Sequence, residues 1–314
     1  MIVGFDIGGT RARALLVDAA MGTIVDTGHD SSDGDGHALV AKLSRIVTEL
    51  EKKNACAVEA IGLGVAGLAH RSGTVRYSPN LPDLVEFPLG PEVARATGVP
   101  VVVGNDATAG TWAEAKLGAG RGSDDFIYVA LGTGIGTGFV SGGRLITGAH
   151  GFAGESGHMV VDFDGPAHRT GQQGPWEHFA SGTALGRVAR DAAHAEAFAF
   201  GVGLAGDVAS ITGYHVAEAV HAGDEEGSAI FDGFCREVAR GIANLAVIFD
   251  PDRVVMGGGL ADIGKPLRDG VQSWLDRLLL GAEHRPPIDV VMAELGSESG
   301  ALGAALLGAD LLDG

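Results

Sequence analysis

The chain has 314 residues, of which 46% are hydrophobic and 20% charged, which suits two folded domains and excludes a disordered chain. Its 40 acidic residues outnumber 22 basic ones, and the formal net charge of −18 disfavours nucleic acid and anionic membranes as partners. The only cysteines, Cys56 and Cys235, cannot form a disulfide framework or a cysteine-based zinc site, so we expect small buried side chains. Without a membrane-length apolar run or a signal-peptide pattern, we expect a soluble, cytoplasmic protein.

The first elements form a hairpin. Apolar runs predict strands over 2–7, over 11–17 and from residue 23, separated by turns at Gly8-Gly9-Thr10 and Met21-Gly22. A dinucleotide-binding fold would place a helix directly after the glycines, and a Walker A loop would continue as Gly-Lys-Ser/Thr. Neither pattern is present, which disfavours the dinucleotide-binding fold and leaves the chain without a Walker A loop.

Helices and strands then alternate. The spacing of apolar residues predicts a helix over 38–53, strands over 60–68 and 101–104, and a helix over 107–117. A strand over 126–131, a glycine turn and a strand from residue 138 repeat the layout of residues 2–17. We interpret this as a weak internal repeat of two similar α/β halves; two unrelated hairpins are the alternative.

The C-terminal part is rich in helix. Residues 176–249 are predicted to be mostly helical, ending with a helix over 235–249 that Asp250-Pro251 stops. Further predictions are strands over 253–256 and 287–292 and a small-residue helix over 299–312.

Three of the predicted strands run directly into glycine turns, where backbone N–H groups can approach a phosphate closely. Together they favour a nucleotide-binding site. The turns are Gly8-Gly9-Thr10, Gly132-Thr133-Gly134 and Gly257-Gly258-Gly259.

Two aspartates lie at strand ends. Asp6 precedes the first glycine turn, where a carboxylate can hold Mg²⁺ or simply form an Asx turn. Asp106 lies between a buried strand and a helix, where it can cap the helix or act as a base toward a substrate hydroxyl. The two roles can also divide between Asn105 and Asp106.

Polar residues gather in a glycine-rich middle section. Glu155, His158 and Glu177 can converge on the hydroxyls of a neutral polyol. A structural histidine with two solvated glutamates is the alternative.

Taken together, these segments resemble the ROK (repressor, open reading frame, kinase) family of the sugar kinase, actin and Hsp70 superfamily. The resemblance runs from Phe5-Asp6-Ile7-Gly8-Gly9-Thr10 to residues 300–305, and residues 154–182 (GESGHMVVDFDGPAHRTGQQGPWEHFASG) are similar to the family's bacterial glucokinase signature. It implies an α/β, two-lobed, actin-like (ribonuclease H-like) ATPase fold with duplicated mixed-sheet domains around a cleft. Residues 1–106 with about 298–314 would form the smaller lobe, and residues 107–297 the larger.

The resemblance also implies a reaction, the ATP- and Mg²⁺-dependent phosphorylation of a hexose at its 6-hydroxyl, with glucose as the leading substrate. Asp106 would be the catalytic base. Sugar hydroxyls would be held by Asn80, Asn105, Glu155, His158 and Glu177, with Gly67 close by. Phosphates and Mg²⁺ would be held by Asp6, Gly8, Gly9, Thr10, Gly132, Thr133 and Gly134, and the adenosine would lie by Gly257, Gly258 and Gly259.

One departure from the family concerns a metal. Many members hold a structural zinc with one histidine and three cysteines in a C-x-C-G-x-x-G-C pattern. His158 matches that histidine, but His168, Thr170 and Pro175 occupy the cysteine positions. Since threonine is a poor zinc ligand and proline has no ligating side chain, we expect no zinc of that kind. A makeshift site using His158, His168 and another histidine is the alternative. A lesser departure is Arg11, where many members have lysine.

Other functions remain open within this resemblance. Fructose, mannose, N-acetylglucosamine and N-acetylmannosamine are alternative substrates, and polyphosphate is an alternative donor that the lack of a basic track disfavours. A sugar-responsive regulator is disfavoured, because it would need a helix-turn-helix before the first strand, which is predicted to begin at Ile2. A non-catalytic sugar-sensing protein is disfavoured because Asp6 and Asp106 are both retained. The resemblance suggests a homodimer or homotetramer.

Overall fold

The computed structural model describes residues 1–313, which divide into two compact units. Unit 1 comprises Met1–Asp124, Gly138–Gly154 and the residues from Glu294 on, and unit 2 comprises Asp125–Thr137 and Glu155–Ala293. The lobe limits expected from the sequence stay a prediction.

Unit 1 contains a five-stranded mixed sheet in the order β3-β2-β1-β4-β7. The strand β1 (Ile2–Ile7) pairs antiparallel with β2 (Arg11–Asp18), which pairs antiparallel with β3 (Thr23–Ser31). On its other side β1 pairs parallel with β4 (Ala60–Val65), and β4 pairs parallel with β7 (Val101–Asn105). The hairpin predicted at the start of the chain is confirmed.

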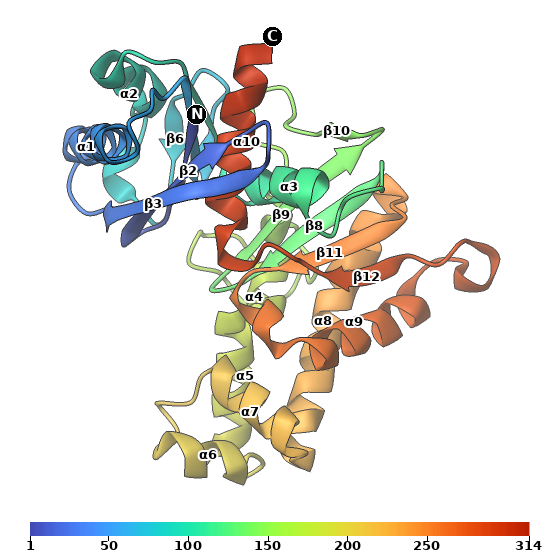
Figure 1. The fold of residues 1–314 in the computed structure, drawn as a ribbon. Helices are drawn as coiled ribbons and strands as arrows, with labels where there is room; N and C mark the ends of the chain where they lie inside the picture. Colours follow the sequence, from blue (N-terminus) through green and yellow to red (C-terminus); the bar gives the residue numbers. More distant parts are fainter. Residues whose placement is uncertain (314) are drawn as a thin grey trace. The chain divides into compact units, whose positions relative to one another are not determined.

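Alternate residues of β1 face opposite sides of this sheet, as the pleat requires. On one side Val3 and Phe5 pack in a core with Leu43 and Ile46 of a long helix. On the other side Ile2 packs in a second cluster with residues of the helices that begin at Asp106 and Ser299. The helices and minor strands of this unit are α1 (Gly36–Asn54), β5 (Leu68–Ala69), β6 (Val75–Tyr77), α2 (Leu89–Thr97), α3 (Asp106–Leu117) and α10 (Ser299–Asp313) (Figure 1).

The last helix lies directly on the sheet, and glycines allow the close approach. A Cβ at Gly4 would lie 2.0 Å from the Ala301 carbonyl oxygen, and one at Gly62 would lie 1.7 Å from that of Ala304. No side chain fits at either distance, so glycine is required on both strands.

The second five-stranded sheet has the order β10-β9-β8-β11-β12. Its parallel part joins β8 (Phe126–Leu131), β11 (Arg253–Gly257) and β12 (Asp289–Met292), while β9 (Ile135–Ser141) and β10 (Arg144–Leu145) pair antiparallel. The two sheets have the same topology: in each, the first strand along the chain lies in the centre and the third lies at an edge. The α/β class and the duplicated mixed sheets predicted from the sequence are thereby confirmed.

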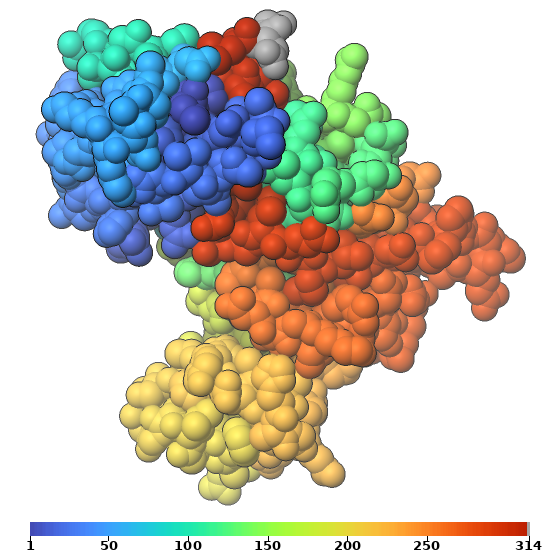
Figure 2. All heavy atoms as spheres, in the orientation of Figure 1, coloured from blue at the N-terminus to red at the C-terminus, as the bar shows by residue number. Residues whose placement is uncertain are grey.

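Unit 2 contains β8, β11 and β12 of this sheet and the helices that are not in unit 1. The helix predicted from residue 235 begins ten residues earlier, because the Asp224 carboxylate accepts a hydrogen bond from the Gly227 N–H and caps it there. These helices are α4 (Trp176–Ala180), α5 (Gly182–His194), α6 (Ala199–Ala205), α7 (Gly213–Ala222), α8 (Glu225–Phe249) and α9 (Lys265–Leu278). Figure 2 shows that the connection between α9 and β12 projects from the surface of this unit. No helix within residues 1–313 has both the length and the apolarity that a bilayer crossing demands.

Some element limits predicted from the sequence are wrong. The strand expected over 60–68 ends at Val65, because Gly67 has a positive φ of 110° and turns the chain. The strand expected from 287 begins at Asp289, after two prolines. Helix α2 was not expected, since its first turn contains both glycine and proline. Cys235 is buried as expected, whereas Cys56 is only partly buried.

Candidate functional site

The carboxyl ends of three strands bring candidate residues to one edge of the unit 1 sheet. Ile7 of β1 pairs with Val65 of β4, and Val65 pairs with Asn105 of β7. Asp6 and Asp106 therefore lie at the carboxyl ends of the two strands that flank β4, where parallel sheets commonly place their ligands.

Of the two roles that the sequence left open, the structure assigns the helix cap to Asn105. Asn105 is the N-cap of α3: its side-chain oxygen lies 2.9 Å from the Ala107 nitrogen and 3.2 Å from the Thr108 nitrogen, and accepts from both. Asp106 is the first residue of the helix, and its Oδ1 accepts a hydrogen bond from the Ala107 N–H at 2.8 Å. Since Asn105 caps the helix, the Asp106 carboxylate is not needed as the cap.

Asp6 and Asp106 are both partly buried carboxyls. Burial raises the pKa of Asp6 from 3.8 to about 6; the charge of Asp106 adds to the rise and that of Arg13 opposes it. Burial also raises the pKa of Asp106, against the hydrogen bond from the Ala107 N–H. A raised pKa makes each carboxylate a better proton acceptor and a stronger attractor of a cation.

The first glycine turn contacts a second candidate residue. A Cβ at Gly9 would lie 2.9 Å from the Asn80 backbone oxygen, so the turn packs tightly against Asn80, whose side chain is exposed. The Gly67 carbonyl accepts a hydrogen bond from the Asn105 side-chain amide at 3.2 Å. Gly8, Gly9, Thr10, Gly67, Asn80, Asn105, Asp6 and Asp106 thus all belong to unit 1.

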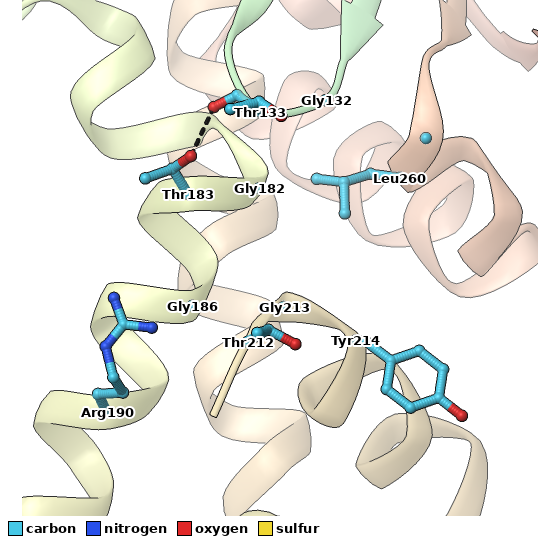
Figure 3. Close-up of a pocket in the computed structure, with 11 residues that line it drawn as sticks. Gly132, Thr133, Gly182, Thr183, Gly186, Arg190, Thr212, Gly213, Tyr214 and Leu260 are labelled. Carbon is cyan, nitrogen blue, oxygen red and sulfur yellow. Dashed lines mark hydrogen bonds between the residues drawn. The ribbon is translucent and has the colours of Figure 1, made fainter. Parts of the chain in front are cut away.

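Unit 2 contains a pocket of about 400 Å³ that brings the second and third glycine turns together. Its lining includes Gly132 and Thr133 after β8, and Gly259 beyond the end of β11. Figure 3 shows the remaining lining along α5 from its start to Arg190, at the start of α7 and on the 3₁₀ turn after β11. Apart from the two turns, the lining residues are Gly182, Thr183, Gly186, Arg190, Thr212, Gly213, Tyr214 and Leu260.

Two hydrogen bonds join the start of α5 to the turn after β8. The Gly182 N–H donates to the Gly132 carbonyl at 2.7 Å, and the Thr183 hydroxyl donates to the Thr133 carbonyl at 2.7 Å (Figure 3). A Cβ at Gly182 would lie 2.8 Å from the Gly132 oxygen, so only glycine fits this approach. The sequence reasoning missed the contribution of α5 and α7; the Ser-Gly-Thr start of α5 was the available signal.

Glu155, His158 and Glu177 also belong to unit 2. Glu155 and His158 lie at the two ends of a short 3₁₀ turn, and the His158 N–H donates to the Glu155 carbonyl at 3.0 Å. Glu177 is in the first turn of α4, and its Oε2 accepts a hydrogen bond from the Ile135 N–H at 2.8 Å. Glu177 is therefore tied to the turn 132–134, directly before Ile135.

The residues at the family's zinc positions do not fit a zinc ion. Both ring nitrogens of His168 have neighbours: Nδ1 lies 2.9 Å from the Thr170 hydroxyl and Nε2 lies 3.3 Å from Glu177 Oε1. Pro175 offers no donor, and across residues 1–313 no three His, Cys, Asp or Glu side chains are grouped to hold a metal. His158 Nδ1 is buried without a hydrogen-bond partner among the described residues, but one nitrogen alone does not make a zinc site.

Comparisons with known proteins agree over nearly the full length. A sequence model of the ROK family matches residues 2–310. The glucokinase of Streptomyces coelicolor is 37% identical over 309 residues, which cover 97% of this chain and 96% of that protein. The N-acetylmannosamine kinase of Shigella flexneri is 29% identical, with coverage of 98% and 97%.

A solved structure agrees as well. The ROK family glucokinase from Streptomyces griseus, in complex with glucose and AMPPNP, is 39% identical and superposes with a TM-score of 0.87, covering 98% of this chain and 99% of that one. The resemblance predicted from the sequence is confirmed: the chain belongs to the ROK family and is a glucokinase-like sugar kinase.

Proposed function

We propose that the protein transfers the γ-phosphoryl group of ATP to the 6-hydroxyl of a hexose, with glucose as the substrate. The observation that carries this is the pair Asp6 and Asp106, two partly buried carboxyls with raised pKa at one sheet edge, with helix capping left to Asn105. The full-length likeness to a glucokinase that binds glucose and AMPPNP supports the same conclusion.

Asp106 is the proposed base. The sugar O6 attacks the γ-phosphorus, a new O6–P bond forms, the bond to the β-phosphate oxygen breaks, and ADP leaves. The O6 proton passes to the Asp106 carboxylate, which accepts it more readily because burial raises its pKa. Since the transition state is loose, most of the base's contribution is the orientation of the hydroxyl.

The pocket of unit 2 is the proposed nucleotide site. Glycine backbone at Gly132 and Gly259 permits close approach of phosphate, and the positive end of the α5 dipole adds to this. Arg190 supplies a guanidinium to the lining, and its Nη1 donates to the Ile211 carbonyl at 2.7 Å. Hydroxyls of Thr133, Thr212 and Tyr214 provide further polar contacts.

Asp6 is the proposed residue for Mg²⁺. Its chemistry fits, because a divalent cation would offset the repulsion from Asp106 that helps raise its pKa. When bound, Mg²⁺ would neutralise charge on the phosphates.

The proposed sugar contacts are Asn80, Asn105 with Gly67 beside it, Glu155, His158 and Glu177. Their amides, carboxylates and imidazole suit neutral hydroxyls. N-acetylmannosamine is the second candidate substrate, favoured by the likeness to the Shigella enzyme. We further propose a cytoplasmic homodimer or homotetramer.

The test is a panel of hexoses with ATP and Mg²⁺, followed by ADP release and by the mass and position of the phosphorylated product. We expect glucose 6-phosphate from glucose, and a fall of about 10²–10⁴-fold in kcat for Asp106→Asn with little change in glucose KM. Asp83→Asn, an exposed aspartate of the same unit, is the matched control. Wild-type turnover in Asp106→Asn would contradict the assignment, and turnover with polyphosphate but not ATP would contradict the donor.

A further inference from the structure

The loop between the His158 turn and α4 closes through its own backbone. The Val161 N–H donates to the Gly174 carbonyl at 2.9 Å, and the Trp176 N–H donates to the Met159 carbonyl at 2.8 Å. Pro175 forms an isolated antiparallel bridge with Val160. The two ends of the loop are thus joined without a metal.

A side-chain contact joins the tip of this loop to its base. The tip turns at Gly171, and the His168 N–H there donates to the Gln172 carbonyl at 2.7 Å. The His168 ring reaches back to Glu177, with Nε2 3.3 Å from Oε1, and both side chains are about seven-eighths buried, with exposed fractions of 12% and 13%. A ring that carries its proton on Nε2 can accept from the Thr170 hydroxyl and present an N–H to the carboxylate.

The other oxygen of the same carboxylate is also engaged. Glu177 Oε2 accepts from the Ile135 N–H, and a Cβ at Gly134 would lie 2.1 Å from this oxygen. Glu177 therefore has one oxygen against the turn 132–134 and the other against His168. A carboxylate held on both sides has a fixed orientation, which a sugar contact requires.

We propose that His168, oriented by Thr170, is a positioning residue that fixes the Glu177 carboxylate and replaces a structural metal in this loop. The three residues at the positions where the family has cysteines all help to close the loop: His168 and Thr170 do so through their side chains, and Pro175 through its bridge to Val160. The kinetic part of this inference rests on the proposed sugar kinase function, whereas the metal-free closure does not.

The first experiment measures metal and stability in the purified full-length protein. Zinc content after dialysis against a chelator, with the unfolding temperature before and after, tests the closure without any activity. We expect well below one zinc per chain and an unchanged unfolding temperature. One zinc per chain, lost to the chelator together with stability, would overturn the proposal.

The second experiment compares variants by glucose calorimetry and by KM and kcat. His168→Leu should weaken glucose binding and raise KM about tenfold, with kcat changed less than about threefold, because a buried contact to a charged group is lost while the chemical step is untouched. His168→Gln should recover most of the affinity, since its amide can still donate to Glu177. His194→Leu, an exposed histidine at the end of α5, is the matched control and should behave as wild type.

If His168→Leu does not fold, Thr170→Val takes its place, since it removes only the hydroxyl that orients the ring; we expect about a threefold rise in KM. Glucose affinity equal to the control in these variants would overturn the positioning role. The positioning role would also be overturned if His168→Gln bound glucose as weakly as His168→Leu, because the loss would then come from altered packing alone. If the wild type neither binds nor phosphorylates a hexose, the proposed function fails, and the metal measurements still decide the closure.

Discussion

The substitution Asp6→Asn should make the empty protein more stable while removing most of its turnover. Burial and the charge of Asp106 raise the pKa of Asp6 from 3.8 to about 6. Since one pKa unit is about 1.4 kcal/mol, holding this carboxylate ionised in the folded protein costs about 3 kcal/mol at neutral pH. Asparagine carries no charge, so the variant avoids this cost, although it loses the ligand proposed for Mg²⁺.

The pH dependence follows from the direction of the rise in pKa. Below pH 3.8 the carboxyl is protonated in both folded and unfolded chains, so it contributes no cost. Between about pH 4 and 6 the unfolded chain loses its proton first, so the folded protein becomes less stable as pH rises; above that range the cost is constant. Asp6→Asn should therefore gain about 1 kcal/mol at pH 4.5 and about 3 kcal/mol at pH 7.5 over the wild type.

Urea unfolding of both proteins without Mg²⁺ at the two pH values measures this gain. Asp83→Asn, which changes an exposed aspartate, should stay within about 0.5 kcal/mol of the wild type at both. Mg²⁺ should stabilise the wild type and leave Asp6→Asn unchanged. A variant no more stable than the wild type at pH 7.5, or a gain that does not shrink at pH 4.5, would refute the reasoning.

Three further substitutions test other parts of the structure. Asn105→Ala should lower the free energy of unfolding by about 1–2 kcal/mol through loss of the α3 cap, measured by urea unfolding; an unchanged value would mean another group caps the helix. Gly182→Ala should raise the KM for ATP about tenfold, because its Cβ would lie 2.8 Å from the Gly132 oxygen and displace the turn; an unchanged KM, with glucose KM as the internal control, would remove that turn from the nucleotide site. Gly241→Ala should cost about 1–3 kcal/mol of stability, since its Cβ would lie 2.0 Å from the buried Trp176 ring, and a wild-type unfolding temperature would contradict this packing.

Local patterns in the sequence predicted the strands and the repeat. The hairpin at 2–17 and its counterpart after 126 are short-range features, because apolar runs and glycine turns act on neighbouring residues. Asp6 and Asp106 could be identified as candidate site residues for the same reason: Asp6 lies at the end of a buried strand, and Asp106 directly follows one. Which of Asn105 and Asp106 caps the helix was open, because a shift of one residue in the start of a helix moves the cap from one to the other.

The proposed nucleotide pocket could be predicted only in part. Its two glycine turns were identified from the sequence, but Gly182, Arg190 and Gly213 were not, because they lie in helices that tertiary packing alone brings to the turns. The contact between His168 and Glu177 could not be predicted from the sequence either, since it depends on how the loop between them folds back.

The loop between the His158 turn and α4 contains no cysteine, and this affects how the protein responds to oxidants. A thiolate-held metal is lost when peroxide oxidises its sulfur ligands, whereas imidazole, hydroxyl and carboxylate are inert to such oxidants. The two cysteines of the chain lie elsewhere, and burial raises the pKa of the Cys235 thiol to about 12, which keeps it in its unreactive protonated form. Mild peroxide therefore has no thiolate to attack in the part of the protein that orients Glu177.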